Sequence, residues 1–252
     1  MNSMTSIVVK SHLLLIAGLS LFHGCRIECT SPCTVQLIDI AEAIVRFRET
    51  ENTLPSPAIY DADGNIMHSW RVLVLPYVKA NRFCSEYDFG EPWNSESNIK
   101  LHSLFSSLSG DSRKGVVAAA ETYQCLGVDK PAPLGMTNFV MVFFDEGRKV
   151  PYRGITGHRN GWQALANPNG ELLVVAIDNQ GVHWTEPRDL SLNGHHFTND
   201  KNVWSRYSQR IYGGVLVNLN GDITLLDANA VEQEMHRIKH LFENTEKLNK
   251  TQ

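Results

Sequence analysis

Apolar positions along the chain change between a helical and a strand-like spacing, and these changes mark the predicted elements. Between residues 35 and 49 apolar side chains recur every three or four positions, as on one face of a helix. Residues 52–57 contain two prolines, so we expect the helix to end before them. A second helix is predicted to begin at a cap on Asn94 or Ser95 and to run to about Leu108.

Two internal runs are typical of buried β-strands. Residues 138–144 are rich in β-branched and aromatic side chains, and residues 171–177 form an apolar run between two turn-forming pairs. Residues 69–78 form the most apolar internal segment before residue 130, and their periodicity fits either a strand or a short buried helix. We therefore expect a sheet whose central strands come from the second half of the chain.

The C-terminal part has the clearest pattern. Residues 214–226 form two apolar runs around Asn220-Gly221, a pair that favours a tight hairpin turn. Asp227 or Asn229 can cap a final helix, whose apolar face is formed by Val231, Met235, Ile238, Leu241 and Phe242. The pattern predicts one α+β domain, in which an N-terminal helix packs on an antiparallel sheet and a C-terminal hairpin precedes a helix.

The first 24 residues have the pattern of an export signal. Lys10 precedes a mostly apolar run at 13–22, and a Gly-Cys pair follows at the exit. The run is too short to span a bilayer. We expect residues 1–24 to be a signal peptide of the lipoprotein type, with Cys25 acylated and 25–252 forming the mature domain. Ordinary cleavage and a buried helix are the alternatives.

Composition excludes several classes of protein. The 252 residues are 42% hydrophobic and 20% charged, which is typical of a globular protein. The 23 Lys and Arg against 27 Asp and Glu give a net charge of −4, so we predict no nucleic-acid partner. Nothing in the sequence indicates a multispanning transporter or a fibrous repeat. Composition alone does not identify a function.

Five cysteines fit an exported protein, because thiols can pair outside the reducing cytosol. If Cys25 carries lipid, then Cys29, Cys33, Cys84 and Cys125 remain as an even set with three pairings. The spacing of Cys25, Cys29 and Cys33 would also align three thiols on a helix, as in a soft-metal site. We favour disulfides, because the chain has no C-x2-C pair and no histidine close after Cys33.

Motifs for catalysis are absent from the sequence. It contains no nucleophile elbow, dinucleotide-binding loop or phosphate-binding loop. His236 and His240 are spaced to share a helix face with Glu232, and a metal-dependent enzyme would need another ligand from elsewhere. A solvated helix face is the interpretation we favour. We predict no catalytic residue, no metal and no cofactor.

The tryptophans allow one alternative function. Aromatic side chains on loops can stack on a ligand, and Trp93, Trp162 and Trp184 are the candidates for an extracytoplasmic solute-binding module. Core packing is the more common role of such residues. We therefore favour a non-enzymatic, lipid-anchored envelope protein, periplasmic or on the cell surface, that contacts the membrane through its anchor and an unknown envelope protein as partner.

Several segments, in order along the chain, carry a family resemblance. They are 33–37 with Ile40, Ala43 and Phe47, then 53–55, 69–77 (SWRVLVLPY), 87–89, 91–94, 123–125, 137–139, 182–190 (VHWTEPRDL) and 213–221. Together they resemble the bacterial domain of unknown function 1559 family, whose members are usually pilin-like proteins with a C-terminal H-x9-DG motif. The resemblance covers roughly residues 33–227 and implies a pilin-like α+β fold without an established reaction.

The resemblance also has implications for single residues. It implies a Cys33–Cys125 disulfide, which leaves Cys29 and Cys84 as a second pair. Two features depart from the family pattern: the lipoprotein-like leader replaces a prepilin peptide with its long apolar helix, and Arg210 stands at the histidine position of the terminal motif. Asn220 stands at the aspartate position, where an Asn-Gly turn still supports the hairpin.

Overall fold

The structure is a computed structural model that describes most of the chain from Cys33 to Asn249 and one short strand near the N-terminus. The described residues are 7–9, 33–78, 87–103, 122–125, 127–133, 135–143, 145–151, 162–166, 170–178, 181–192 and 210–249. None of the helices in these stretches has both the length and the apolar composition needed to cross a membrane. The architecture is α+β, as predicted.

The predicted N-terminal helix is confirmed as α1, Thr34–Glu51. It ends at Asn52, whose left-handed backbone (φ 55°) stops the helix before the proline-containing segment. Its inner face is fully buried and includes Leu37, Ile40, Ala41, Ile44 and Phe47. These side chains pack against β9, β10 and β7 of the main sheet, so the amphipathic pattern sets the position of the helix.

The main sheet has six strands in the order β1-β10-β9-β7-β4-β8. The strands are β1 (Ile7–Val9), β4 (Phe139–Phe143), β7 (Glu171–Ile177), β8 (Leu190–Ser191), β9 (Ile211–Asn218) and β10 (Ile223–Leu226). Neighbours pair antiparallel except β4 and β8, which run parallel. The two predicted buried strands are confirmed as β7, at the centre of this sheet, and its neighbour β4.

The hairpin of β9 and β10 forms as predicted around residues 219–221. Asn218 holds the turn, because its Oδ1 accepts hydrogen bonds from the backbone N–H groups of Asn220 (2.9 Å) and Asp222 (3.0 Å). Gly221 has φ 83°, a backbone conformation that glycine adopts without steric cost. The strands pair from Ile223 with Val217 onward.

The final helix is α6, Ala228–Asn249, and Asp227 is its cap: Oδ1 accepts from the backbone N–H of Ala230 at 2.8 Å. Val231, Met235, Ile238 and Phe242 are buried, as predicted. The prediction for Leu241 was wrong, since it is 43% exposed. Leu241 lies at the edge of the apolar face of α6, beside Ile238. At this edge the helix surface faces away from the sheet, so the side chain remains partly exposed.

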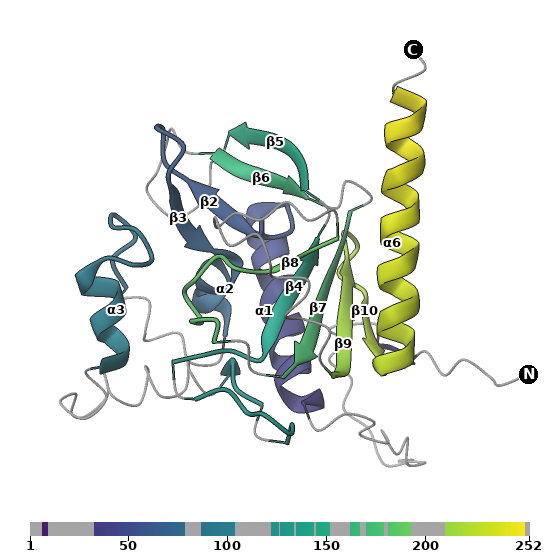
Figure 1. Ribbon diagram of the computed structural model, residues 1–252, viewed down its shortest axis with the longest axis horizontal. Helices are drawn as coiled ribbons and strands as arrows, with labels where there is room; N and C mark the ends of the chain where they lie inside the picture. Colours follow the sequence, from purple (N-terminus) through teal and green to yellow (C-terminus); the bar gives the residue numbers. More distant parts are fainter. Residues whose placement is uncertain are drawn as a thin grey trace, which may run out of the picture.

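The two long helices flank the main sheet (Figure 1). Strand residues alternate between them: Val215 and Val217 belong to the core on the α1 side, whereas Leu216 packs with the cluster that contains Val231 of α6. At Gly214, a Cβ atom would lie 2.8 Å from both the Val174 carbonyl oxygen and Val231 Cγ2. The missing side chain at this position therefore allows α6 to approach β9 closely.

A second sheet, which the sequence did not predict, has the order β3-β2-β6-β5. Its strands are β2 (Ala58–Tyr60), β3 (Ile66–Ser69), β5 (Asp145–Pro151) and β6 (Trp162–Ala166). The ambiguous segment that follows β3 is helical, with α2 at Trp70–Leu73 and a 3-10 turn, η1, at Leu75–Tyr77. The helix predicted from Asn94 or Ser95 is described as α3, Glu96–Ser103.

Candidate functional site

Cys33 and Cys125 form a disulfide at the start of α1. Both residues are fully buried, their Cα atoms are 5.4 Å apart, and 92 positions separate them in the sequence. This is the pairing that the family resemblance implies. Cys33 lies at the N-cap of α1, so the bond fastens that helix to the loop at 122–133. The predicted lipidation site Cys25 and the second predicted pair, Cys29 and Cys84, lie outside the described residues.

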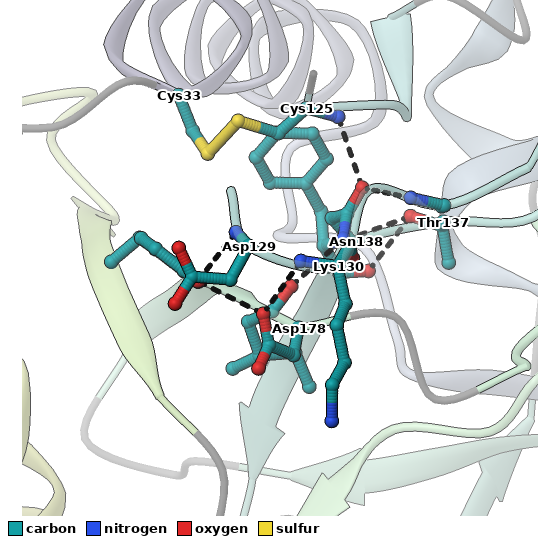
Figure 2. Close-up of a disulfide and its surroundings, with 11 residues drawn as sticks. Cys33, Cys125, Asp129, Lys130, Thr137, Asn138 and Asp178 are labelled. Carbon is teal, nitrogen blue, oxygen red and sulfur yellow. Dashed lines mark hydrogen bonds between the residues drawn. A yellow bond between two sulfur atoms is a disulfide. The ribbon is translucent and has the colours of Figure 1, made fainter. Parts of the chain in front are cut away.

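Asn138 holds the loop that carries Cys125. Its side chain is fully buried, and Oδ1 accepts hydrogen bonds from the backbone N–H groups of Cys125 (3.1 Å) and Ala132 (2.9 Å). Its Nδ2 donates to the carbonyl oxygens of Lys130 (3.2 Å) and Ile177 (2.9 Å). Figure 2 shows this amide beneath the disulfide. One side chain therefore fixes the loop from both of its ends and ties it to β7.

A polar cluster closes the outer side of the same loop. The hydroxyl of Tyr212 donates to Asp178 Oδ1 (2.9 Å) and accepts from the backbone N–H of Asp129 (2.7 Å). Asp178 also accepts from the backbone N–H of Lys130 (3.2 Å), as Figure 2 shows. The exposed Arg210 donates to Asp129 at 2.6 Å. We call this region, comprising Cys33, the 122–133 loop, Asp178, Arg210 and Tyr212, the disulfide end.

A fully buried ion pair joins two distant segments of the chain. Arg71 Nη2 lies 2.6 Å from Asp189 Oδ1, and neither side chain is exposed. The same carboxylate accepts from Trp70 Nε1 (3.0 Å) and from the backbone N–H of Met141 (2.7 Å). Burial raises the pKa of Asp189 above its ordinary value, although the Arg71 guanidinium and these N–H donors oppose the rise. All these partners are N–H donors, which suit an ionised carboxylate.

The rest of the Arg71 side chain is also satisfied. Its Nε and Nη2 donate to the Phe139 carbonyl oxygen (3.0 and 2.8 Å), and Nη1 donates to that of Glu186 (3.1 Å). The hydroxyl of Tyr123 donates to the Arg71 carbonyl oxygen at 2.7 Å. Arg71 therefore joins the helix after β3 to the first residue of β4 and to the segment before β8. This arrangement is suited to fixing the core rather than to exchanging protons with a substrate.

Aromatic rings form a stack beside this ion pair. Trp184 is 1% exposed and lies parallel to Tyr123, with ring centroids 5.8 Å apart. The ring of His183 lies 6.5 Å from that of Trp184, and it also lies 6.5 Å from the ring of the half-buried Trp93. The structure thus brings two of the three predicted ligand-stacking tryptophans near one histidine, but Trp184 has its ring covered by this chain. The backbone of Trp162 lies in β6, on the second sheet.

His183 and His68 are both held by internal contacts. Burial lowers the pKa of His183 to about 4, and its Nδ1 lies 2.6 Å from Thr185 Oγ1. His68 is fully buried between the Tyr87 hydroxyl (3.0 Å) and the Phe89 carbonyl oxygen (3.1 Å). Burial also raises the pKa of Tyr87. His183 and Tyr87 are therefore uncharged near neutral pH. The backbone N–H of Trp93 donates to the Met67 carbonyl oxygen (2.8 Å), which links this region to β3 of the second sheet.

The histidine pair considered for a metal lies on the exposed face of α6. His236 and His240 are both exposed, and His240 Nδ1 is 2.9 Å from Asn244 Nδ2. Glu232 is also exposed. Within the stretches of chain that the structure describes, no group of three or more His, Cys, Asp or Glu residues is arranged to hold a metal ion.

One family model matches the chain, that of a protein of unknown function called DUF1559, over residues 31–165. This segment is just over half of the 252 residues. The chain belongs to this family. No curated protein matches the DUF1559 chain, and no solved structure matches it either.

The structure explains why two of the DUF1559-like blocks contain charged residues. Arg71 of SWRVLVLPY and Asp189 of VHWTEPRDL are the two members of the buried ion pair. In the terminal motif, Arg210 at the histidine position binds Asp129, and Asn220 at the aspartate position lies in the hairpin turn. The two departures from the motif therefore have structural partners in this chain.

Sequence reasoning did not single out Arg71, Asp189 or Asn138 as a connected site. One signal was present for Arg71, because it is the single charge within the apolar segment 69–78. A charge in such a segment requires a buried partner of opposite charge or a set of hydrogen bonds. The identity of that partner was not accessible, since Asp189 lies 118 positions further along the chain.

Proposed function

We propose that this DUF1559 protein is a non-enzymatic, exported and lipid-anchored protein of the cell envelope with a structural or interaction role. The observation that carries the proposal is the buried disulfide between Cys33 and Cys125. Disulfides form and persist in oxidising compartments and are rare in the cytosol. The leader supports the same conclusion, because its charge, short apolar run and exit cysteine fit an exported lipoprotein. Cleavage before Cys25 would also remove β1, so β10 would become the edge strand of the main sheet in the mature protein.

The non-enzymatic part of the proposal is supported by how the polar side chains are used. Arg71 and Asp189 bind each other in the core, and Asn138 makes four hydrogen bonds to backbone groups. His183 is bound to Thr185 and kept neutral by burial. Groups that in enzymes act on a substrate here connect one segment of the chain to another.

The solute-binding alternative gains no specific support. Its candidate Trp184 is 1% exposed, and its ring is packed against those of Tyr123 and His183. A ligand would have to displace these neighbours to reach the ring. We therefore propose the envelope role alone.

The test is the intact mass of the protein recovered from the membrane fraction, measured with and without reductant. We expect the mass of residues 25–252 plus a diacylglyceryl group, and an increase on reduction that corresponds to the hydrogens added to each disulfide. A Cys25→Ala variant is the control, which should lack the lipid mass and leave the membrane fraction. Full-length, unprocessed protein in the cytosol with free thiols would overturn the proposal, as would turnover of a substrate by the purified protein.

A further inference from the structure

The point at which a lipid anchor would join the folded domain is fixed by the disulfide. Cys33 is the first described residue after the leader region, and it is bonded to Cys125 at the start of α1. We propose that the disulfide end of the domain faces the bilayer, whereas the turn between β2 and β3 faces away from it. This proposal rests on the lipid anchor at Cys25 proposed above.

The reach of the tether limits how the domain can sit on a membrane. Eight residue steps join Cys25 to Cys33, and even a fully extended chain of that length spans at most about 26–29 Å. Cys33 and the disulfide end therefore cannot lie further than about 26–29 Å from the anchored Cys25.

The opposite end of the domain lies too far from the tether for easy contact. α1 has 18 residues, so its axis is about 27 Å long and separates Cys33 from the segment that enters β2. In Figure 1 the turn between β2 and β3 lies at the end of the molecule away from the start of α1. For the turn at 61–65 to touch the bilayer, Cys33 would have to be raised by nearly the full reach of the tether. That orientation requires a tether stretched to nearly its maximum length, whereas the orientation with the disulfide end toward the bilayer does not.

The surface of the disulfide end is compatible with a bilayer of lipid headgroups. Its exposed charges are largely compensated, because Arg210 and Asp129 form an ion pair at 2.6 Å and both remain about two-thirds exposed. Lys130 is exposed beside them and adds a positive charge. On the first turn of α1, Val35 is 63% exposed and offers apolar area at the same end. In this orientation the Asp129 carboxylate that faces the lipid phosphates is already paired with Arg210.

The experiment uses the full-length gene product, purified from membranes in its acylated form and reconstituted into phosphatidylcholine vesicles. A fluorescent amino acid replaces either Lys130, at the disulfide end, or Ala62, in the β2–β3 turn; both positions are exposed. Vesicles with a nitroxide on the lipid headgroup quench a nearby fluorophore. We expect loss of emission from position 130 and unchanged emission from position 62.

Equal quenching at both positions, or stronger quenching at position 62, would overturn the orientation. The intact mass of the same samples reports acylation separately. A missing lipid mass refutes the proposed anchor at Cys25, whereas an acylated protein that is quenched equally at both positions refutes only the orientation. Non-reducing electrophoresis checks that the Cys33–Cys125 bond is present in both labelled variants. A labelled protein that is acylated, oxidised and quenched only at position 130 supports the proposal.

Discussion

Removal of the charge from Asp189 should destabilise the protein strongly. In Asp189→Asn the side chain keeps its shape but loses the carboxylate that lies 2.6 Å from Arg71 and accepts from Trp70 and Met141. An amide can accept at one oxygen only, and its NH₂ group would face the guanidinium donors. Breaking a fully buried pair from one side costs about 3–5 kcal/mol, because the remaining charge has no counter-ion. We expect the free energy of unfolding to fall by that amount.

Urea unfolding of the oxidised protein, followed by tryptophan fluorescence, measures this change. Glu42→Gln is the matched control: Glu42 pairs with Arg46 on the exposed side of α1, 3.4 Å apart, and such surface pairs contribute about 0–1 kcal/mol. Our reasoning about the buried pair would be refuted if Asp189→Asn lost no more stability than Glu42→Gln. A variant that no longer folds, beside a folded control, agrees with the expectation, since the predicted loss is a large part of the stability of a typical domain.

Three further predictions concern the disulfide, the contact of α6 with β9, and pH. Replacing Cys33 and Cys125 with alanine should lower the free energy of unfolding by about 4–5 kcal/mol, because the bond closes a loop across 92 positions. The urea midpoint of this variant should match that of the reduced wild type. Gly214→Ala should lower the free energy of unfolding by about 1–3 kcal/mol, since its Cβ would lie 2.8 Å from Val231 Cγ2. A melting temperature equal to that of the wild type would contradict the close packing of α6 on β9. His183 has a pKa lowered by burial from 6.5 to about 4, so the unfolded chain takes up the proton first as the pH falls. Its contribution to stability should decrease by up to about 3 kcal/mol from pH 6.5 to pH 4, and His183→Gln should show a smaller pH dependence in urea titrations across that range.

The parts of the fold that could be predicted are those whose signal is local. The face of α1 and the Asn220-Gly221 turn each depend on residues close in sequence, so periodicity and turn chemistry were sufficient. The cap at Asp227 follows from the same local chemistry. These local signals were sufficient to predict the α+β class correctly.

The second sheet and the buried ion pair could not be predicted because their partners are distant. β2 has only three residues, directly after Pro57, and becomes a strand through pairing with β3 and with the distant β6. Arg71 acquires its role from Asp189 on another segment. Asn138 likewise acts on backbone groups of a loop and of β7, and a single asparagine at a strand start does not reveal such partners.

The stretch of sequence that identifies the family is not the stretch that folds together. The family match ends at residue 165, and it contains β4 but neither of the strands that flank it, because β7 and β8 both lie beyond that residue. A fragment cut at that boundary would expose both edges of a buried strand and leave Arg71 without its counter-ion. The last third of the chain is therefore constrained by contacts with the part that the family model covers, although the model itself does not extend over it.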